Sequence, residues 1–169
     1  MIYLLDADVL INAERDYYPR ERVPEFWDWL LHQAERGAIR TLRRITSKLK
    51  QQPTKDRPED PLSEWIRAHE GSLVIEPPDR TAVLRVWTRG HQQGASALDL
   101  PNVDDDAFLV AAALTDPAER IVVTMEKRST KKGLNRRIPQ VCGIVGVKCI
   151  DTFEFIRELD FRTGWREHP

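Results

Sequence analysis

The sequence predicts an α/β protein, a three-layer α/β/α sandwich around a central parallel sheet. The first observation is that short apolar, β-branched runs alternate with amphipathic helical segments along the chain. The second is that no two of these runs are joined by a hairpin-type turn. The third is size, since 169 residues suit one domain, and we expect a single domain over residues 1–169.

Four apolar runs have the length and composition of buried strands. They lie at residues 2–5, 73–75, 121–124 and 147–150.

The helices are indicated by apolar residues that recur every three or four positions. The clearest begins at Val23, with Pro24 in its first turn and Gly37 where it stops. Asp79 and Asp151 are expected to cap two later helices. Further helices are predicted over residues 41–52, 62–71, 79–92, 107–114, 138–144 and 152–159, and prolines at 53, 58 and 61 mark a polar linker.

The charges are segregated along the chain. The net charge is −1, from 26 Lys and Arg against 27 Asp and Glu. Residues 36–55 hold seven basic side chains and residues 127–137 hold six, with no acid in either segment. The remaining 138 residues carry 13 bases and 27 acids, a net charge of −14. Such a partition suits a protein that holds a cation on one surface and a polyanion beside it.

Several classes of protein are excluded by composition. No apolar run approaches the roughly 20 residues of a membrane span. The opening residues lack the basic start of a signal peptide, so we expect a cytoplasmic protein. Cys142 and Cys149 are too few for a disulfide scaffold, and the four histidines share no ligand spacing.

Carboxylates follow the predicted strands where each one ends. Asp6 and Asp8 follow the first strand, Glu126 follows the third, and residues 104–106 precede the helix leading into it. Ligands of parallel sheets gather at the carboxyl ends of strands, so these acids are expected to meet there. Crowded carboxylates favour a cation, and Mg²⁺ or Mn²⁺ suits oxygen ligands. Taken one by one, each of these acids has a structural explanation as a turn former or helix cap.

The motifs resemble those of the PIN-domain ribonucleases. The run Tyr3-Leu4-Leu5-Asp6-Ala7-Asp8 resembles the family's first strand and aspartate. Residues 106–111 resemble its third acidic position, and residues 121–126 the segment that carries its fourth acid. Shorter matches at residues 16–19, 26–30 and 138–142 are similar to a prokaryotic subgroup of about this length.

This resemblance implies a metal-dependent ribonuclease with bound Mg²⁺ or Mn²⁺. Many small prokaryotic members are toxins of toxin–antitoxin pairs (the VapC type), so RNA and an antitoxin protein are the implied partners. Asp6, Asp106 and Glu126 would be the catalytic and metal-binding acids, with Asp8 and Asp104 as further metal ligands and Thr124 positioning a water or ligand. The basic segments supply the expected RNA-binding residues, namely Arg43, Arg44, Lys48, Lys127, Arg128, Lys131 and Lys132.

One family position is not matched. The family places a glutamate in a stretch matching residues 42–50, which here contains no acid. Either Asp8 or Glu64 compensates, or the chain is a weakened nuclease that binds RNA or a partner protein without cutting. A second alternative is a haloacid-dehalogenase-type phosphatase, because Asp6-Ala7-Asp8-Val9 also fits that signature, although its later motifs stand in a different order.

The aromatic residues are interpreted mainly as structural. Trp27, Trp65 and Trp87 fall on apolar helix faces and are expected in the core or a subunit interface. An exposed Trp29 would suit a homodimer. The two cysteines are expected to be inert thiols in apolar surroundings.

Overall fold

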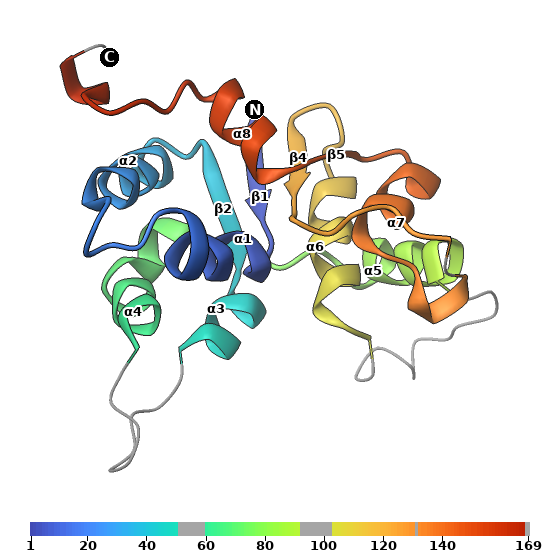
Figure 1. The fold of residues 1–169 in the computed structure, drawn as a ribbon. Coiled ribbons are helices and arrows are strands. Elements are labelled where there is room, and N and C mark those ends of the chain that lie inside the picture. The colour runs from blue at the N-terminus through green and yellow to red at the C-terminus, as the bar shows by residue number, and fades with distance from the viewer. Residues whose placement is uncertain (51–59, 92–102, 131, 168–169) are drawn as a thin grey trace.

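The computed structural model describes residues 1–50, 60–91, 103–130 and 132–167. Five parallel strands form one sheet in the order β3-β2-β1-β4-β5 (Figure 1). The strands are β1 (Ile2–Leu5), β2 (Ile39–Leu42), β3 (Val74–Ile75), β4 (Arg120–Val123) and β5 (Lys148–Ile150). The predicted fold class is therefore confirmed.

The helices cover both faces of this sheet. Most of them are connections between successive strands, as a parallel sheet requires. They are α1 (Ala7–Asn12), α2 (Pro24–Glu35), α3 (Arg43–Leu49), α4 (Pro61–Leu73), α5 (Arg80–Val86), α6 (Asp105–Leu114), α7 (Ile138–Val145) and α8 (Thr152–Glu158). Short helical turns also lie at Ala13–Tyr17, Trp87–His91, Gly133–Asn135 and Trp165–Glu167.

The side chains of β1 divide the core into two layers. Tyr3 and Leu5 point into an aromatic-rich layer formed with α2, α4 and α8. Leu4 points the other way, into an aliphatic layer formed with α5, α6 and α7. Figure 1 shows α2 and α4 on the opposite side of the sheet from α5, α6 and α7. This alternation is the period-two pattern of a strand buried on both faces.

The expected helix caps are present. Asp79 and Asp151 each accept a hydrogen bond from the backbone amide three residues ahead, at 2.8 Å. Pro24 stands in the first turn of α2, and Gly37 follows that helix with a φ of +80°, a conformation that favours glycine.

Two expectations about local structure were wrong. The strand β2 was not predicted, and the helix expected over residues 41–52 is shortened to α3 because β2 takes its first residues. Trp29, expected to be exposed, is 1% exposed and packs against Phe26, Phe155 and Phe161. It therefore belongs to the core and cannot supply a dimer surface.

The other tryptophans lie in the core as expected. Trp27 and Trp65 meet edge to face with ring centroids 4.9 Å apart, and Trp87 packs in the aliphatic layer. Within the described segments, no helix is long and apolar enough to cross a membrane.

Candidate functional site

Asp6 and Asp8 lie together at the carboxyl end of β1, as the sequence predicts. Asp6 continues the sheet by donating its backbone amide to Val123 of β4, and its side chain caps α1 through the amide of Ala7 at 2.7 Å. Asp8 stands in the first turn of α1 and accepts the amide of Met125 at 3.0 Å. The junctions that follow β1 and β4 thus hold both carboxylates at one edge of the sheet.

Thr124 links the two carboxylates. Its hydroxyl lies 3.1 Å from Asp6 Oδ2 and 3.1 Å from Asp8 Oδ2, and it accepts the backbone amide of Glu126. A hydroxyl carries one proton and can donate to only one carboxylate at a time. Asp8 Oδ2 also accepts the backbone amide of Met125 at 3.0 Å, so Asp8 keeps a donor when the hydroxyl donates to Asp6. The structure thus places Thr124 between Asp6 and Asp8.

Asp106 completes the acidic set from α6. Burial is the main cause that raises its pKa to about 6, and the charges of Asp104 and Glu126 raise it further. Burial likewise raises the pKa of Asp6 to about 7, with Asp8 and Asp106 adding repulsion. The pKa of Asp8 is also raised, mainly by burial. Negative charge is thus concentrated where β1 ends and α6 begins.

The carboxylates of Asp6, Asp8 and Asp106 are not arranged around a common point. Across the described residues, no three His, Cys, Asp or Glu side chains already stand close enough to share one metal ion. Binding a divalent cation with all three of Asp6, Asp8 and Asp106 would therefore require these side chains to move toward it. Their oxygen-rich donor set and their mutual repulsion fit Mg²⁺ or Mn²⁺ in chemistry.

Glu126 lies beside this acidic set but is held by α7. Its Oε2 accepts the backbone amide of Ile138 at 2.8 Å, and its Oε1 accepts the guanidinium of Arg137. Both carboxylate oxygens therefore have partners within the chain. A metal ion at the acidic edge would compete with Arg137 for Glu126.

Asp104 and its neighbour Asp105 have different surroundings from Asp106. Asp104 is exposed and caps α6 by accepting the amide of Ala107 at 3.0 Å. Asp105 is 8% exposed, yet its pKa is lowered because Lys48 and Arg44 outweigh the effect of burial. The sequence analysis included Asp105 among the acids at 104–106, but nothing local to α6 reveals its partners Arg44 and Lys48, which lie about sixty positions earlier.

The basic residues of α3 are partly paired with acids. Arg44 Nε lies 2.8 Å from Asp105, Lys48 also contacts Asp105, and Arg43 lies 3.5 Å from Glu70. The remaining predicted RNA-binding residues come from the second basic segment. Lys127, Arg128 and Lys132 are exposed, and Lys131 lies outside the described residues.

The stretch that lacks the family glutamate is contacted by an acidic residue of another helix, Glu70 of α4. Glu70 of α4 accepts the hydroxyl of Thr46 at 2.6 Å and the ammonium of Lys50 at 2.7 Å. These contacts, with that of Lys50 the largest, lower the pKa of Glu70. Glu70 thus fastens α4 to α3. Glu64, one of the compensating acids considered, is an exposed residue 3.9 Å from Arg20.

His32, His69 and Cys142 lie in structural surroundings. His32 packs against Trp165 and His69 against Trp65. Cys142 is buried, and a hydrogen bond with Cys149 together with burial raises the pKa of its thiol. A raised pKa keeps the thiol protonated and unreactive.

The comparisons with known proteins identify one family. A family model described as a domain of unknown function (DUF4411) matches residues 3–163. No curated protein matches the chain.

Proposed function

Because the chain belongs to the family described as a domain of unknown function (DUF4411), its chemistry must be inferred from its own residues, and we propose that it is an Mg²⁺- or Mn²⁺-dependent ribonuclease. The observation that carries the proposal is the convergence of Asp6, Asp8 and Asp106 at the carboxyl edge of a parallel sheet. Ligands of open α/β sheets bind at this edge.

Asp6, Asp8 and Asp106 are the residues that would hold the metal. When bound, such an ion polarises a phosphoryl oxygen and lowers the pKa of a bound water. Thr124 supports the site because its hydroxyl lies 3.1 Å from the carboxylates of both Asp6 and Asp8. The carboxylates of Asp6, Asp8 and Asp106 would otherwise repel a phosphodiester, so a cation is needed for an RNA backbone to approach these acids.

The basic segments supply the attraction for RNA. Exposed cations at residues 127, 128 and 132 follow β4 and lie on the chain directly after Thr124 and Glu126. Phosphate contacts of this kind give affinity that falls with salt and carries little sequence information. RNA held along this segment would pass close to the acidic edge.

The test compares RNA cleavage by the wild type and by single carboxylate variants. Single-stranded RNA is incubated with Mn²⁺, with and without EDTA. Asp6→Asn and Asp106→Asn are expected to lower cleavage by more than about 100-fold, beyond the 10- to 100-fold typical of residues that only support a ligand. Asp28→Asn, an exposed residue paired with Arg166, is the control. Wild-type protein that shows no Mn²⁺-dependent cleavage would contradict the proposal.

A binding protein without catalysis is the second candidate. The specific observation in its favour is that Arg44 and Lys48 occupy the helix where the resemblance calls for a glutamate and contact Asp105. Such a protein would bind RNA in EDTA and in Mn²⁺ equally and leave it intact. Hydrolysis of p-nitrophenyl phosphate instead of RNA would indicate the phosphatase alternative.

The proposal that this ribonuclease is a toxin, with an antitoxin as partner, rests on the resemblance to PIN-domain proteins alone. It is tested by co-expressing the chain with the product of any small adjacent reading frame that encodes a DNA-binding protein. Growth arrest by the chain alone, relieved by the second protein and absent for Asp6→Asn, is the expected result. Arrest that persists in Asp6→Asn would contradict it.

A further inference from the structure

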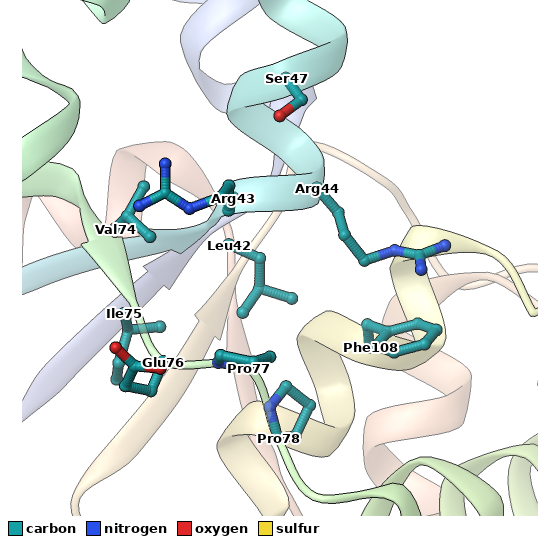
Figure 2. A pocket seen from close by; sticks show the side chains of 10 residues that line it. All are labelled: Leu42, Arg43, Arg44, Ser47, Val74, Ile75, Glu76, Pro77, Pro78 and Phe108. Carbon is teal, nitrogen blue, oxygen red and sulfur yellow. The ribbon is translucent and has the colours of Figure 1, made fainter.

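A cleft of about 470 Å³ opens beside the acidic edge, at the carboxyl ends of β2 and β3 (Figure 2). Its walls come from three separate parts of the chain: the start of α3, the segment after β3, and the first turns of α6. Most of its lining is apolar, and cations stand at its rim.

The floor of the cleft offers flat apolar surfaces. Pro77 and Pro78 lie beneath Leu42, and the ring of Phe108 faces the same space from α6, as Figure 2 shows. Phe108 is only half-buried. Rings and proline faces of this kind pack well against a planar heterocycle.

The rim holds a guanidinium in a fixed plane. Arg44 lies over the ring of Phe108, with its central carbon 4.0 Å from the ring centroid, while its Nε contacts Asp105 at 2.8 Å. These two contacts hold the side chain in one orientation although 44% of it is exposed. Arg43 extends toward the opposite side of the cleft and is 69% exposed. A planar cation is a stacking surface for a base as well as a partner for phosphate.

The cleft lies next to the proposed catalytic acids. The strand β2 that ends in the cleft pairs directly with β1, and Asp6 directly follows β1. Paired strands lie about 4.8 Å apart. On the other wall, Phe108 shares a face of α6 with Asp105, three positions earlier, and Arg44 contacts both. A polynucleotide with one phosphate at the acids would therefore place a neighbouring nucleotide at this cleft.

We propose that this cleft receives one base of single-stranded RNA and selects which base is bound next to the cleaved phosphate. The inference rests on the proposed ribonuclease function for the identity of the ligand. Planar apolar walls hold the base by stacking, and the arginines offer positive charge to its phosphate. Ser47 and Glu76 stand in the lining with a hydroxyl and a carboxylate, groups that discriminate between base edges.

The experiment fills the cleft and measures binding in EDTA, where metal-dependent cleavage is absent. Ser47 is an exposed lining residue, so Ser47→Trp adds bulk to the cleft and Ser47→Ala is the matched control. Fluorescence anisotropy gives the Kd for labelled hexamers of U, C and A. Loss of one stacked base corresponds to roughly a 5- to 150-fold weaker Kd. We expect Ser47→Trp to weaken binding of the preferred hexamer by a factor within that range and to remove the preference among the three hexamers. Ser47→Ala is expected to change the Kd by less than about twofold.

Arg44→Lys is a second variant that keeps the charge but loses the planar group. It is expected to weaken binding of the preferred hexamer. The dependence of Kd on salt should stay the same, because the number of phosphate contacts is retained. Thermal unfolding of each variant verifies that it is folded.

The outcomes separate this inference from the proposed function. If Ser47→Trp binds every hexamer as the wild type does, the inference fails, whether or not RNA is cleaved. If binding responds as expected but Mn²⁺ gives no cleavage, the base cleft stands and the nuclease proposal fails. If the wild type binds no hexamer, or an apolar peptide occupies the cleft without affecting RNA binding, the inference is overturned.

Discussion

Replacing Asp6 with asparagine should stabilise the protein at pH 8 but not in acid. Asp6 is 9% exposed, and burial, with repulsion from Asp8 and Asp106, raises its pKa from 3.8 to about 7. A carboxyl group whose pKa is raised on folding is favourable to the fold only while it is protonated. Its contribution is fully present below pH 3.8, falls as the pH rises, and is lost above about pH 7.

The magnitude follows from that shift. A pKa change of about 3 units corresponds to on the order of 4 kcal/mol at 1.36 kcal/mol per unit. Asparagine carries no charge and keeps one oxygen for the Ala7 amide, but it loses the hydrogen bond that Asp6 Oδ2 accepts from Thr124. A typical hydrogen bond contributes about 1 kcal/mol. We therefore expect a gain of about 3 kcal/mol at pH 8. At pH 4.5 the carboxyl group of the unfolded chain is already mostly ionised, which destabilises the wild type by about 1 kcal/mol and offsets the lost hydrogen bond, so we expect almost no difference there.

The assay is urea unfolding followed by tryptophan fluorescence in EDTA at several pH values. Asp28→Asn serves as the control, because Asp28 on α2 forms an exposed ion pair with Arg166 and such pairs contribute at most about 1 kcal/mol. Adding Mn²⁺ at pH 8 should stabilise the wild type and narrow its difference from Asp6→Asn. A difference between the two proteins that is the same at pH 4.5 and pH 8 would refute the reasoning.

Two further predictions concern packing and the Glu126 contact. Gly90→Ala should destabilise the protein by roughly 1 to 3 kcal/mol in urea unfolding, since the added Cβ would lie 2.6 Å from a methyl group of Val141. The control is Gly71→Ala, where a Cβ meets no atom within 4 Å, and this change should stabilise the protein by up to about 1 kcal/mol. Equal changes in stability at both sites would contradict the argument. Arg137→Ala should tighten Mn²⁺ binding severalfold, as measured by calorimetry, because it removes a cation that competes for Glu126. The free energy of unfolding should change by less than about 1 kcal/mol. Weaker Mn²⁺ binding would show that Arg137 does not compete with the metal ion.

The fold class could be predicted because periodicity along the chain reports burial directly. Tyr3, Leu4 and Leu5 are all buried, as a strand covered on both faces requires. The strand β2 was missed because Arg40 interrupts its short apolar pattern. The structure accommodates Arg40 through its guanidinium, which donates to the carbonyls of Ala34, Ile39 and Ser72. Such partners come from other elements and have no local signature in the sequence.

The acids of the candidate site could be anticipated from their positions, but their partners could not. Asp6 and Asp106 follow or precede predicted elements, and topology brings them to one edge of the sheet. The contact between Arg137 and Glu126 depends on how α7 begins, and the contact between Lys48 and Asp105 joins two helices far apart in the chain. Composition shows that opposite charges exist, whereas only the fold shows which of them meet.

These contacts change the meaning of the basic helix α3. On the sequence alone, seven cations over residues 36–55 are candidates for phosphate binding. In the structure, Arg44 and Lys48 compensate Asp105, which leaves Asp106, one position later, facing the uncompensated edge with Asp6 and Asp8. The pKa of Asp105 is therefore lowered and that of Asp106 is raised, because Asp105 faces α3 and Asp106 faces β1. The cations of α3 thus limit the acidic edge on one side, and they leave the charge of Asp6, Asp8 and Asp106 available for a metal ion.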